Sequence, residues 1–195
     1  MMRKAEIQRR TGETDVRLAL TVDGTGGCRL DTGVAFLEHM LTLMAKFSGF
    51  DLTVDAQGDL DVDAHHTVED IGICLGETLV RALGNKEDIR RFGHALIPMD
   101  ESLVLVAVDL SGRGYLAFDG QLPMERLGNF ETELVPEFLQ ALAMNGRFNL
   151  HVRVLAGRNT HHIIEAIFKG LGRALGDAVA LNQGKGIPST KGVIN

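Results

Sequence analysis

The sequence has few of the residues that mark a secreted, membrane-bound or cysteine-rich protein. It contains two cysteines in 195 residues, so neither a disulfide framework nor a cysteine-based zinc site is expected. Its longest apolar run, Leu103 to Val108, is long enough for a strand and far too short to cross a membrane. The first residues are basic, but no apolar core follows them, so we expect no secretory signal. A cytoplasmic location is the default expectation.

Aromatic residues and excess positive charge are scarce as well. The chain has no tryptophan and one tyrosine, which leaves few side chains on which bases could stack. Its formal net charge of −6 argues against the basic face that a nucleic-acid partner would need. The length of 195 residues allows one sizeable domain or two small fused ones. A hydrophobic content of 45% without a long apolar run predicts a soluble globular protein.

The pentapeptide His-His-x-x-Glu occurs twice, at residues 65–69 and 161–165. Each copy opens a stretch with helical periodicity, which places its side chains over one side of a helix start. Adjacent histidines on one helix splay too far apart to hold one ion, but two facing motifs can hold a pair. Imidazole and carboxylate together suit Mn, Fe, Zn, Co or Ni. Chance, or ordinary polar residues at a helix start, explains two matching copies poorly. The six candidate ligands are His65, His66, Glu69, His161, His162 and Glu165.

The two motifs belong to a longer internal repeat. An offset of 96 places the first motif on the second, an offset of 98 places residues 50–54 on 148–152, and an offset of 88 places residues 12–16 on 100–104. Three blocks that match in order indicate a duplicated unit. We predict a first unit at 1–93 and a second at 94–195, which ends in a glycine-rich basic tail at 182–195. The default for such a tail is a frayed end.

Each unit shows alternating apolar residues, a glycine-rich turn, a helical stripe, a second strand and a longer helix. This order predicts an α+β fold in which four helices form a layer between two mixed β-sheets. The expected elements are strands at 16–22, 52–56, 103–110 and 150–155, helices at 36–47 and 134–142, and longer helices that begin near residues 65 and 161.

Two octahedral ions need more than six ligands, and His39 is the obvious addition. It lies on an apolar helical stripe, where a polar ring needs a reason, although such a histidine is more often a hydrogen-bonded core residue. The offset of 98 places His39 on Glu137, so we predict these two as equivalent ligands in a shell hard enough for Mn²⁺. His151 is the alternative to Glu137 and ranks lower, because its repeat partner, Thr53, cannot play the same role.

Several cations stand where a phosphate site is plausible: Arg91 at the junction of the units, Arg113 in a glycine-rich turn, Lys169 one helical turn after the second motif, and Lys191 beside two hydroxyls of the tail. Arginine, lysine and hydroxyl groups are the usual partners of phosphate. Each of these cations, taken alone, is more often a solvated surface charge.

Acids in tight polar turns are candidates for the general base. Glu13, its repeat partner Glu101, and Asp100 all stand in such turns. Each can equally be a turn-capping residue, so the sequence leaves the choice open.

Five segments together resemble the imidazoleglycerol-phosphate dehydratase family, and the resemblance extends over the whole chain. The doubled His-His motif is nearly restricted to that family. The resemblance implies a duplicated α+β fold with a helical layer between two sheets, and two Mn²⁺ ions in sites completed by assembly into a cage of twenty-four subunits. The segments are residues 32–41, 63–72, 109–113, 157–166 and 188–192.

The resemblance also assigns roles residue by residue. Some family members have histidine where this chain has Glu137, and no fused phosphatase domain fits in the chain. The implied metal ligands are His39, His65, His66, Glu69, Glu137, His161, His162 and Glu165. The implied substrate-binding residues are Glu13, Arg91, Arg113, Lys169, Ser189 and Lys191. The candidate catalytic residues are Glu13, Glu69, Glu165, His65 and His162.

The activity that the resemblance implies is a step of L-histidine biosynthesis, carried out by a monofunctional lyase. It dehydrates D-erythro-imidazole glycerol phosphate to imidazole acetol phosphate and water. Two metals on the ring nitrogens would stabilise an imidazolate, and loss of hydroxide would give a diazafulvene-like intermediate. Glu13 would move the proton, and the cations would anchor the phosphate.

Two other readings fit the ligand set. A dinuclear metallohydrolase would use metal-bound hydroxide on a phosphate ester, but the high ratio of histidine to carboxylate argues against it. A metal-storage or assembly protein would use the histidine clusters to join subunits, but it would not need the basic residues.

Overall fold

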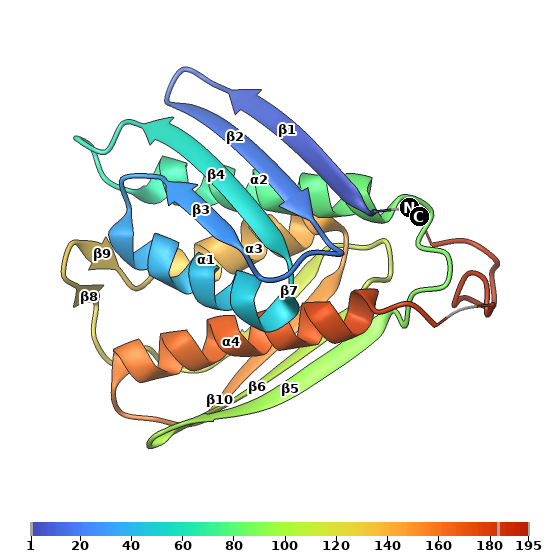
Figure 1. Ribbon diagram of the computed structural model, residues 1–195. Coiled ribbons are helices and arrows are strands. Elements are labelled where there is room, and N and C mark those ends of the chain that lie inside the picture. The colour runs from blue at the N-terminus through green and yellow to red at the C-terminus, as the bar shows by residue number, and fades with distance from the viewer. Residues whose placement is uncertain (1, 183, 195) are drawn as a thin grey trace.

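The computed structural model describes residues 2–182 and 184–194, folded as two four-stranded sheets with helices between them (Figure 1). The strand order is β1-β2-β4-β3 in one sheet and β5-β6-β10-β7 in the other. In each sheet the last two strands are parallel and the other neighbours antiparallel. The two sheets therefore share one topology, which confirms the predicted duplicated α+β fold with its helical layer.

The elements of the first half are β1 (Lys4–Arg10), β2 (Thr14–Thr21), β3 (Cys28–Asp31), α1 (Ala35–Ser48), β4 (Asp51–Gly58) and α2 (His65–Leu83). Those of the second half are β5 (Phe92–Met99), β6 (Ser102–Asp109), β7 (Tyr115–Asp119), β8 (Arg126–Leu127), β9 (Phe130–Glu131), α3 (Leu134–Gly146), β10 (Asn149–Ala156) and α4 (Thr160–Val179).

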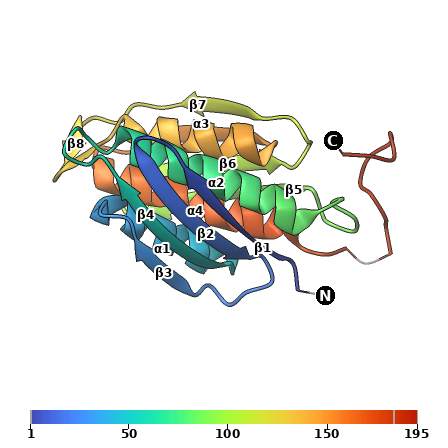
Figure 2. The same cartoon turned by 90° about the horizontal axis from the view of Figure 1, so that it is seen from above.

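The helices pack across the boundary between the repeats. Helix α1 lies against α4 and α2 lies against α3, while α2 covers the first sheet and α4 the second (Figure 2). Glycines allow the close approach: a Cβ at Gly76 would lie 2.5 Å from the backbone nitrogen of Gly146, and one at Gly172 would lie 2.4 Å from the carbonyl oxygen of Met44. This packing brings the N-terminal part of α4 beside α1, where four of the eight predicted ligands lie.

The sequence analysis did not foresee β1, β3, β7 or the short hairpin β8–β9. Strand β1 is an edge strand that turns only Ala5, Ile7 and Arg9 towards the helices, so its alternation is weak. Strand β3 has four residues, of which Leu30 alone packs against the core. Short edge strands gain their stability from the neighbouring strand rather than from their own pattern.

The C-terminal tail is not frayed over its described residues, which corrects the default expectation. The backbone N–H of Asn182 donates to the carbonyl of Asp88, at 2.6 Å, and the N–H of Gly186 donates to the Asp88 carboxylate, also at 2.6 Å. The Arg91 guanidinium donates to the carbonyl of Pro188, at 2.9 Å. The tail thus packs against the junction between the repeats; residues 183 and 195 lie outside the described part.

Within the described residues, no helix combines the length and the apolar character that a membrane span requires.

Candidate active site

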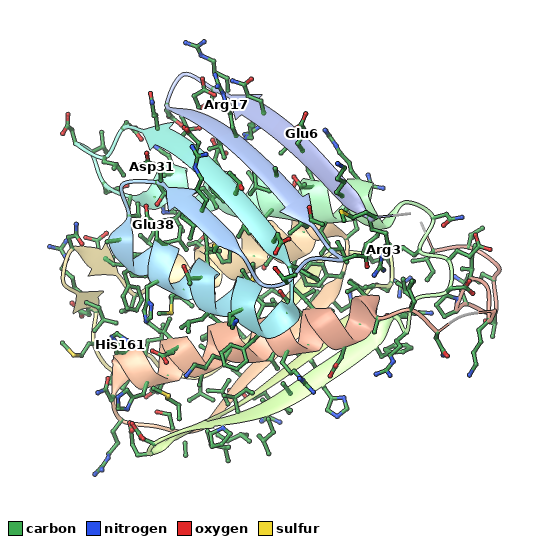
Figure 3. The ribbon with its side chains drawn as sticks, in the orientation of Figure 1. Arg3, Glu6, Arg17, Asp31, Glu38 and His161 are labelled. Carbon is green, nitrogen blue, oxygen red and sulfur yellow. The ribbon has the colours of Figure 1, made fainter. Side chains whose placement is uncertain are left out.

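Three predicted ligands from two helices converge near the start of α4. Nε2 of His39, on α1, lies 3.5 Å from Oε2 of Glu165, and Nε2 of His161 lies 3.3 Å from the same oxygen. One ligand atom from each residue lies within 4.8 Å of the other two. Figure 3 places His161 at the N-terminal end of α4, under α1. Two imidazole nitrogens and one carboxylate oxygen at these separations fit a divalent ion such as Mn²⁺.

Local contacts at the start of α4 fix the position of His161. Asn159 caps α4, because its side-chain oxygen accepts hydrogen bonds from the backbone N–H groups of His161 and His162. The cap sets where the helix begins, and the spacing of four residues then places His161 and Glu165 on one face. Phe36, one turn before His39, packs edge-on against the His161 ring with centroids 5.4 Å apart.

Glu165 is oriented by a lysine one turn further along α4. Nζ of Lys169 lies 2.7 Å from Oε1 of Glu165, which leaves Oε2 turned towards the histidines. Burial disfavours the charged carboxylate, but the hydrogen bond from Lys169 and the nearby His39 outweigh it and lower the pKa of Glu165. Lys169, a predicted substrate-binding residue, therefore forms an ion pair with Glu165, a predicted metal ligand.

The second histidine of the second motif is held by an acid from the β5–β6 turn. Nδ1 of His162 lies 2.8 Å from Oε2 of Glu101, and this hydrogen bond raises the pKa of His162. Oε1 of Glu101 accepts hydrogen bonds from the backbone N–H groups of Arg158 and Asn159, at 3.0 and 2.7 Å. The bond to His162, together with these two, holds the pKa of Glu101 well below its usual range. A histidine held at Nδ1 in this way offers Nε2 to a metal.

The matching histidine of the first motif is held by a residue that the sequence analysis missed. Nδ1 of His66 lies 2.9 Å from Oδ2 of Asp59, and this hydrogen bond raises the pKa of His66. The carboxylate of Glu13 lies further away, with Oε2 3.8 Å from the same nitrogen. The offset of 98 places Asp59 on Gly157, so the repeat gave no signal for it.

The repeat equivalents of the first three ligands are Glu137, His65 and Glu69. Across residues 2–182 and 184–194, the group on α1 and α4 is the one set of three such ligand atoms within 4.8 Å of one another. Glu137 is exposed in the first turn of α3. His151 is exposed on β10, on the face turned away from the helices, since its neighbours Leu150 and Val152 are buried. Glu137 is therefore on the helical layer with the other predicted ligands, and His151 is not.

Four predicted substrate-binding residues gather where the tail meets the junction of the repeats. They line an open hollow of about 680 Å³ between the tail and the β6–β7 turn. Arg91 is partly engaged there, because its Nε donates to Asp109 at 2.7 Å. A larger hollow, of about 1000 Å³, is lined mainly by the strands of the first sheet and by none of the predicted site residues. The four residues in the smaller hollow are Arg91, Arg113, Ser189 and Lys191.

This basic hollow and the metal-ligand group lie at opposite ends of α4. The backbone N–H of Arg91 donates to the carbonyl of Ala178, near the C-terminal end of the helix. Ala178 is thirteen residues beyond Glu165, which at the helical rise corresponds to about 20 Å. Figure 3 shows the tail at the opposite end of α4 from His161. One small substrate cannot contact both groups within a single chain.

Comparison with known proteins decides the family. The family model described as imidazoleglycerol-phosphate dehydratase matches residues 32–175. The chain belongs to the imidazoleglycerol-phosphate dehydratase family. It is therefore a hydro-lyase, as the resemblance implied. The roles of individual residues stay predictions.

Relatives and solved structures agree with this family over the full chain. The imidazoleglycerol-phosphate dehydratase of Desulforudis audaxviator is 70% identical over 195 residues, covering 100% of both chains. That of Acetivibrio thermocellus is 57% identical, again over 100% of both. The crystal structure of the Staphylococcus aureus family member superposes with a TM-score of 0.84 at 43% identity, covering 91% of this chain and 99% of that one. The fold described above is thus the fold of this dehydratase family.

Proposed function

We propose that the chain dehydrates D-erythro-imidazole glycerol phosphate to imidazole acetol phosphate with the help of two Mn²⁺ ions. Membership of the dehydratase family supports dehydration in histidine biosynthesis. The observation that carries the metal dependence is the convergence of His39, His161 and Glu165 within 4.8 Å. The donor atoms of these three residues are imidazole nitrogens and a carboxylate oxygen, which suit Mn²⁺.

The ligands divide into two equivalent sets in this proposal. His39, His161 and Glu165 would hold one ion, and the repeat-related Glu137, His65 and Glu69 the other. His66 and His162 would add Nε2 to these shells, since a carboxylate already holds Nδ1 of each. When bound, the ions supply Lewis acidity that lets the imidazole ring accept negative charge at neutral pH.

The remaining residues move the proton and hold the phosphate. The substrate has no carbonyl beside the proton to be lost, so its own ring must accept the electrons. The proposed route therefore passes through an imidazolate and a diazafulvene-like form of the substrate. The exposed carboxylate of Glu13 is the candidate general base. Arg113 and Lys191 in the basic hollow, with Arg91 and Ser189, would anchor the phosphate and orient the reacting end.

We further propose that the active site is completed between subunits of a homo-oligomer, as in a cage of twenty-four. The support is the separation of about 20 Å, estimated from the helical rise, between the metal ligands and the basic hollow in one chain. A neighbouring subunit that brings its hollow to these ligands would close the site. We expect the assembly in the cytoplasm, without a membrane or nucleic-acid partner, in line with the net charge of −6.

A turnover assay on metal-stripped protein tests this function. The protein is given imidazole glycerol phosphate with and without added Mn²⁺, and both the ketone product and free phosphate are measured. The expected result is Mn²⁺-dependent ketone without phosphate release. Phosphate without ketone would indicate the metallohydrolase instead, and neither product from folded, metal-loaded protein would favour the storage protein.

A further inference from the structure

We propose that Asp59 is a positioning residue that orients His66 and thereby leaves the carboxylate of Glu13 free to act on the substrate. The proposal rests on the dehydratase function proposed above. Its basis is a difference between the two repeats, in which equivalent acids have different partners.

In the second repeat, the acid of the turn is fully engaged. Glu101 holds Nδ1 of His162 at 2.8 Å with one oxygen. Its other oxygen accepts the backbone N–H groups of Arg158 and Asn159. The side chain is 27% exposed. An acid held at both oxygens orients its histidine and is poorly placed to take a proton from a substrate.

In the first repeat, the equivalent acid, Glu13, does not hydrogen-bond to the histidine. Glu13 occupies the place of Glu101 at the offset of 88, yet its side chain is 57% exposed and its Oε2 lies 3.8 Å from Nδ1 of His66, beyond hydrogen-bonding distance. The turn itself is fixed, because the backbone N–H of Glu13 donates to Oγ1 of Thr11 at 3.1 Å. Asp59 holds His66 instead, because its Oδ2 lies 2.9 Å from Nδ1 of the ring.

A longer loop makes this exchange possible. Residues 59–64 connect β4 to the first His pair, whereas residues 157–160 connect β10 to the second, so the first loop is longer by two residues. The short loop turns its backbone N–H groups towards Glu101. The long loop carries its own carboxylate, Asp59, where the short one has Gly157. The first repeat therefore has one more acid beside its histidine pair than the orientation of that histidine needs.

Loss of Asp59 should therefore lower activity indirectly, by changing the contacts of Glu13. Without Asp59, the acid nearest to Nδ1 of His66 is Glu13, whose Oε2 is 3.8 Å away and whose exposed side chain has room to rotate. It would then make the contact that Glu101 makes in the second repeat. His66 would stay oriented for the metal, but the candidate base would be occupied.

A double-mutant cycle between these two acids tests the inference, with kcat, KM and bound Mn²⁺ per chain as readouts. Glu13→Gln should lower kcat by about 100-fold or more, which is the usual contribution of a positioned general base to the rate. Asp59→Ala should lower kcat by roughly ten- to 100-fold with Mn²⁺ content and KM nearly unchanged. The double variant should be little worse than Glu13→Gln alone, because both changes remove the same group. Asp61→Asn, an exposed change in the same loop, is the matched control and should leave kcat unchanged.

A crystal structure of the Asp59→Ala protein, or of Asp59→Leu should the first variant fail to fold, adds a readout that does not depend on activity, since neither side chain can accept a hydrogen bond from His66. Glu13 should lie within about 3 Å of Nδ1 of His66. Additive losses in the cycle, a loss of Mn²⁺ that accounts for the whole effect, or a Glu13 that keeps its position would each overturn the inference. An inactive wild-type protein would instead count against the proposed function, and the crystal structure would still decide the role of Asp59.

Discussion

Nε2 of His39 lies 3.5 Å from Oε2 of Glu165, although the two residues belong to different repeats. The contact exists because α1 of the first repeat packs against α4 of the second. Duplication of one unit therefore creates a place where candidate metal ligands from both copies meet. The same duplication predicts a second such place on α2 and α3, with Glu137 in the position of His39.

Glu165→Gln should weaken Mn²⁺ binding while leaving the fold intact. The change removes the charge that faces two histidines and keeps the shape of the side chain. We expect more than about a tenfold loss of affinity, since even residues that only support a ligand have effects of this size. Titration calorimetry on metal-stripped protein measures it. His94→Ala, on the exposed face of β5, is the control; equal affinities in both variants would contradict the assignment.

Glu137→Ala and His151→Ala should differ in the amount of Mn²⁺ that each retains. Glu137 is exposed on a helix of the layer that carries the other ligands, whereas His151 lies on the outer face of the second sheet. Elemental analysis of the purified variants should therefore show reduced Mn²⁺ for Glu137→Ala only. Normal content in that variant and a deficit in His151→Ala would reverse the ranking of the two residues.

Arg113→Ala should raise KM more than it lowers kcat. Arg113 lines the basic hollow with Ser189 and Lys191, which makes it a candidate phosphate anchor. A hydrogen bond to a charged group contributes about 1.5–3 kcal/mol, so binding should weaken by roughly ten- to 100-fold. Steady-state kinetics and the affinity for a phosphate-ester analogue measure this. Slower turnover with unchanged binding of the analogue would show that Arg113 does not anchor the phosphate.

Gly172→Ala should destabilise the fold, although alanine is ordinarily the better helix former by about 1 kcal/mol. An added Cβ would lie 2.4 Å from the carbonyl oxygen of Met44 on α1, and a backbone atom cannot easily move away. Overpacking of this kind costs about 1–3 kcal/mol in the free energy of unfolding. Urea denaturation measures the loss, with the exposed neighbour changed by Arg173→Ala for comparison. A gain in stability would mean that the two helices are not in this contact.

The two cysteines should differ in reactivity. Cys28 is exposed, whereas Cys74 is buried in α2, and burial, with Asp70 nearby, raises the pKa of Cys74 to about 12. At pH 8, iodoacetamide should therefore label Cys28 in the native protein and Cys74 only in denaturant. Because the pKa of Cys74 is raised by folding, its protonated form favours the folded state. That contribution should be complete below about pH 9 and be lost as the pH rises towards 12. Rapid native labelling of Cys74 would contradict its placement.

The sequence predicted the elements whose pattern is strong and local. The repeat and the buried stripes located all four helices and the strands in the middle of each sheet. They also named the three candidate ligands whose side chains lie together on α4 and α1. It did not predict β1 or β3, because edge strands bury few side chains of their own. Nor did it predict the hydrogen bond between Asp59 and His66, since that loop has no counterpart of equal length in the second repeat. The packing of the tail depends on individual hydrogen bonds with Asp88 and Arg91, for which no periodic pattern exists.

The central claim is that the metal ligands and the basic hollow act together in one site that is shared between chains. Two variants test it: Glu165→Gln, which weakens the ligand group, and Arg113→Ala, which weakens the hollow. At concentrations of substrate and Mn²⁺ that half-saturate the wild-type protein, each should have little activity alone. The measurement is dehydratase turnover under these conditions after the two are unfolded, mixed and reassembled. Recovery of a substantial part of the wild-type turnover is expected, because some sites then combine intact ligands from one chain with an intact hollow from another. A mixture that stays as inactive as its components, in assemblies shown by mass spectrometry to contain both variants, would contradict the account.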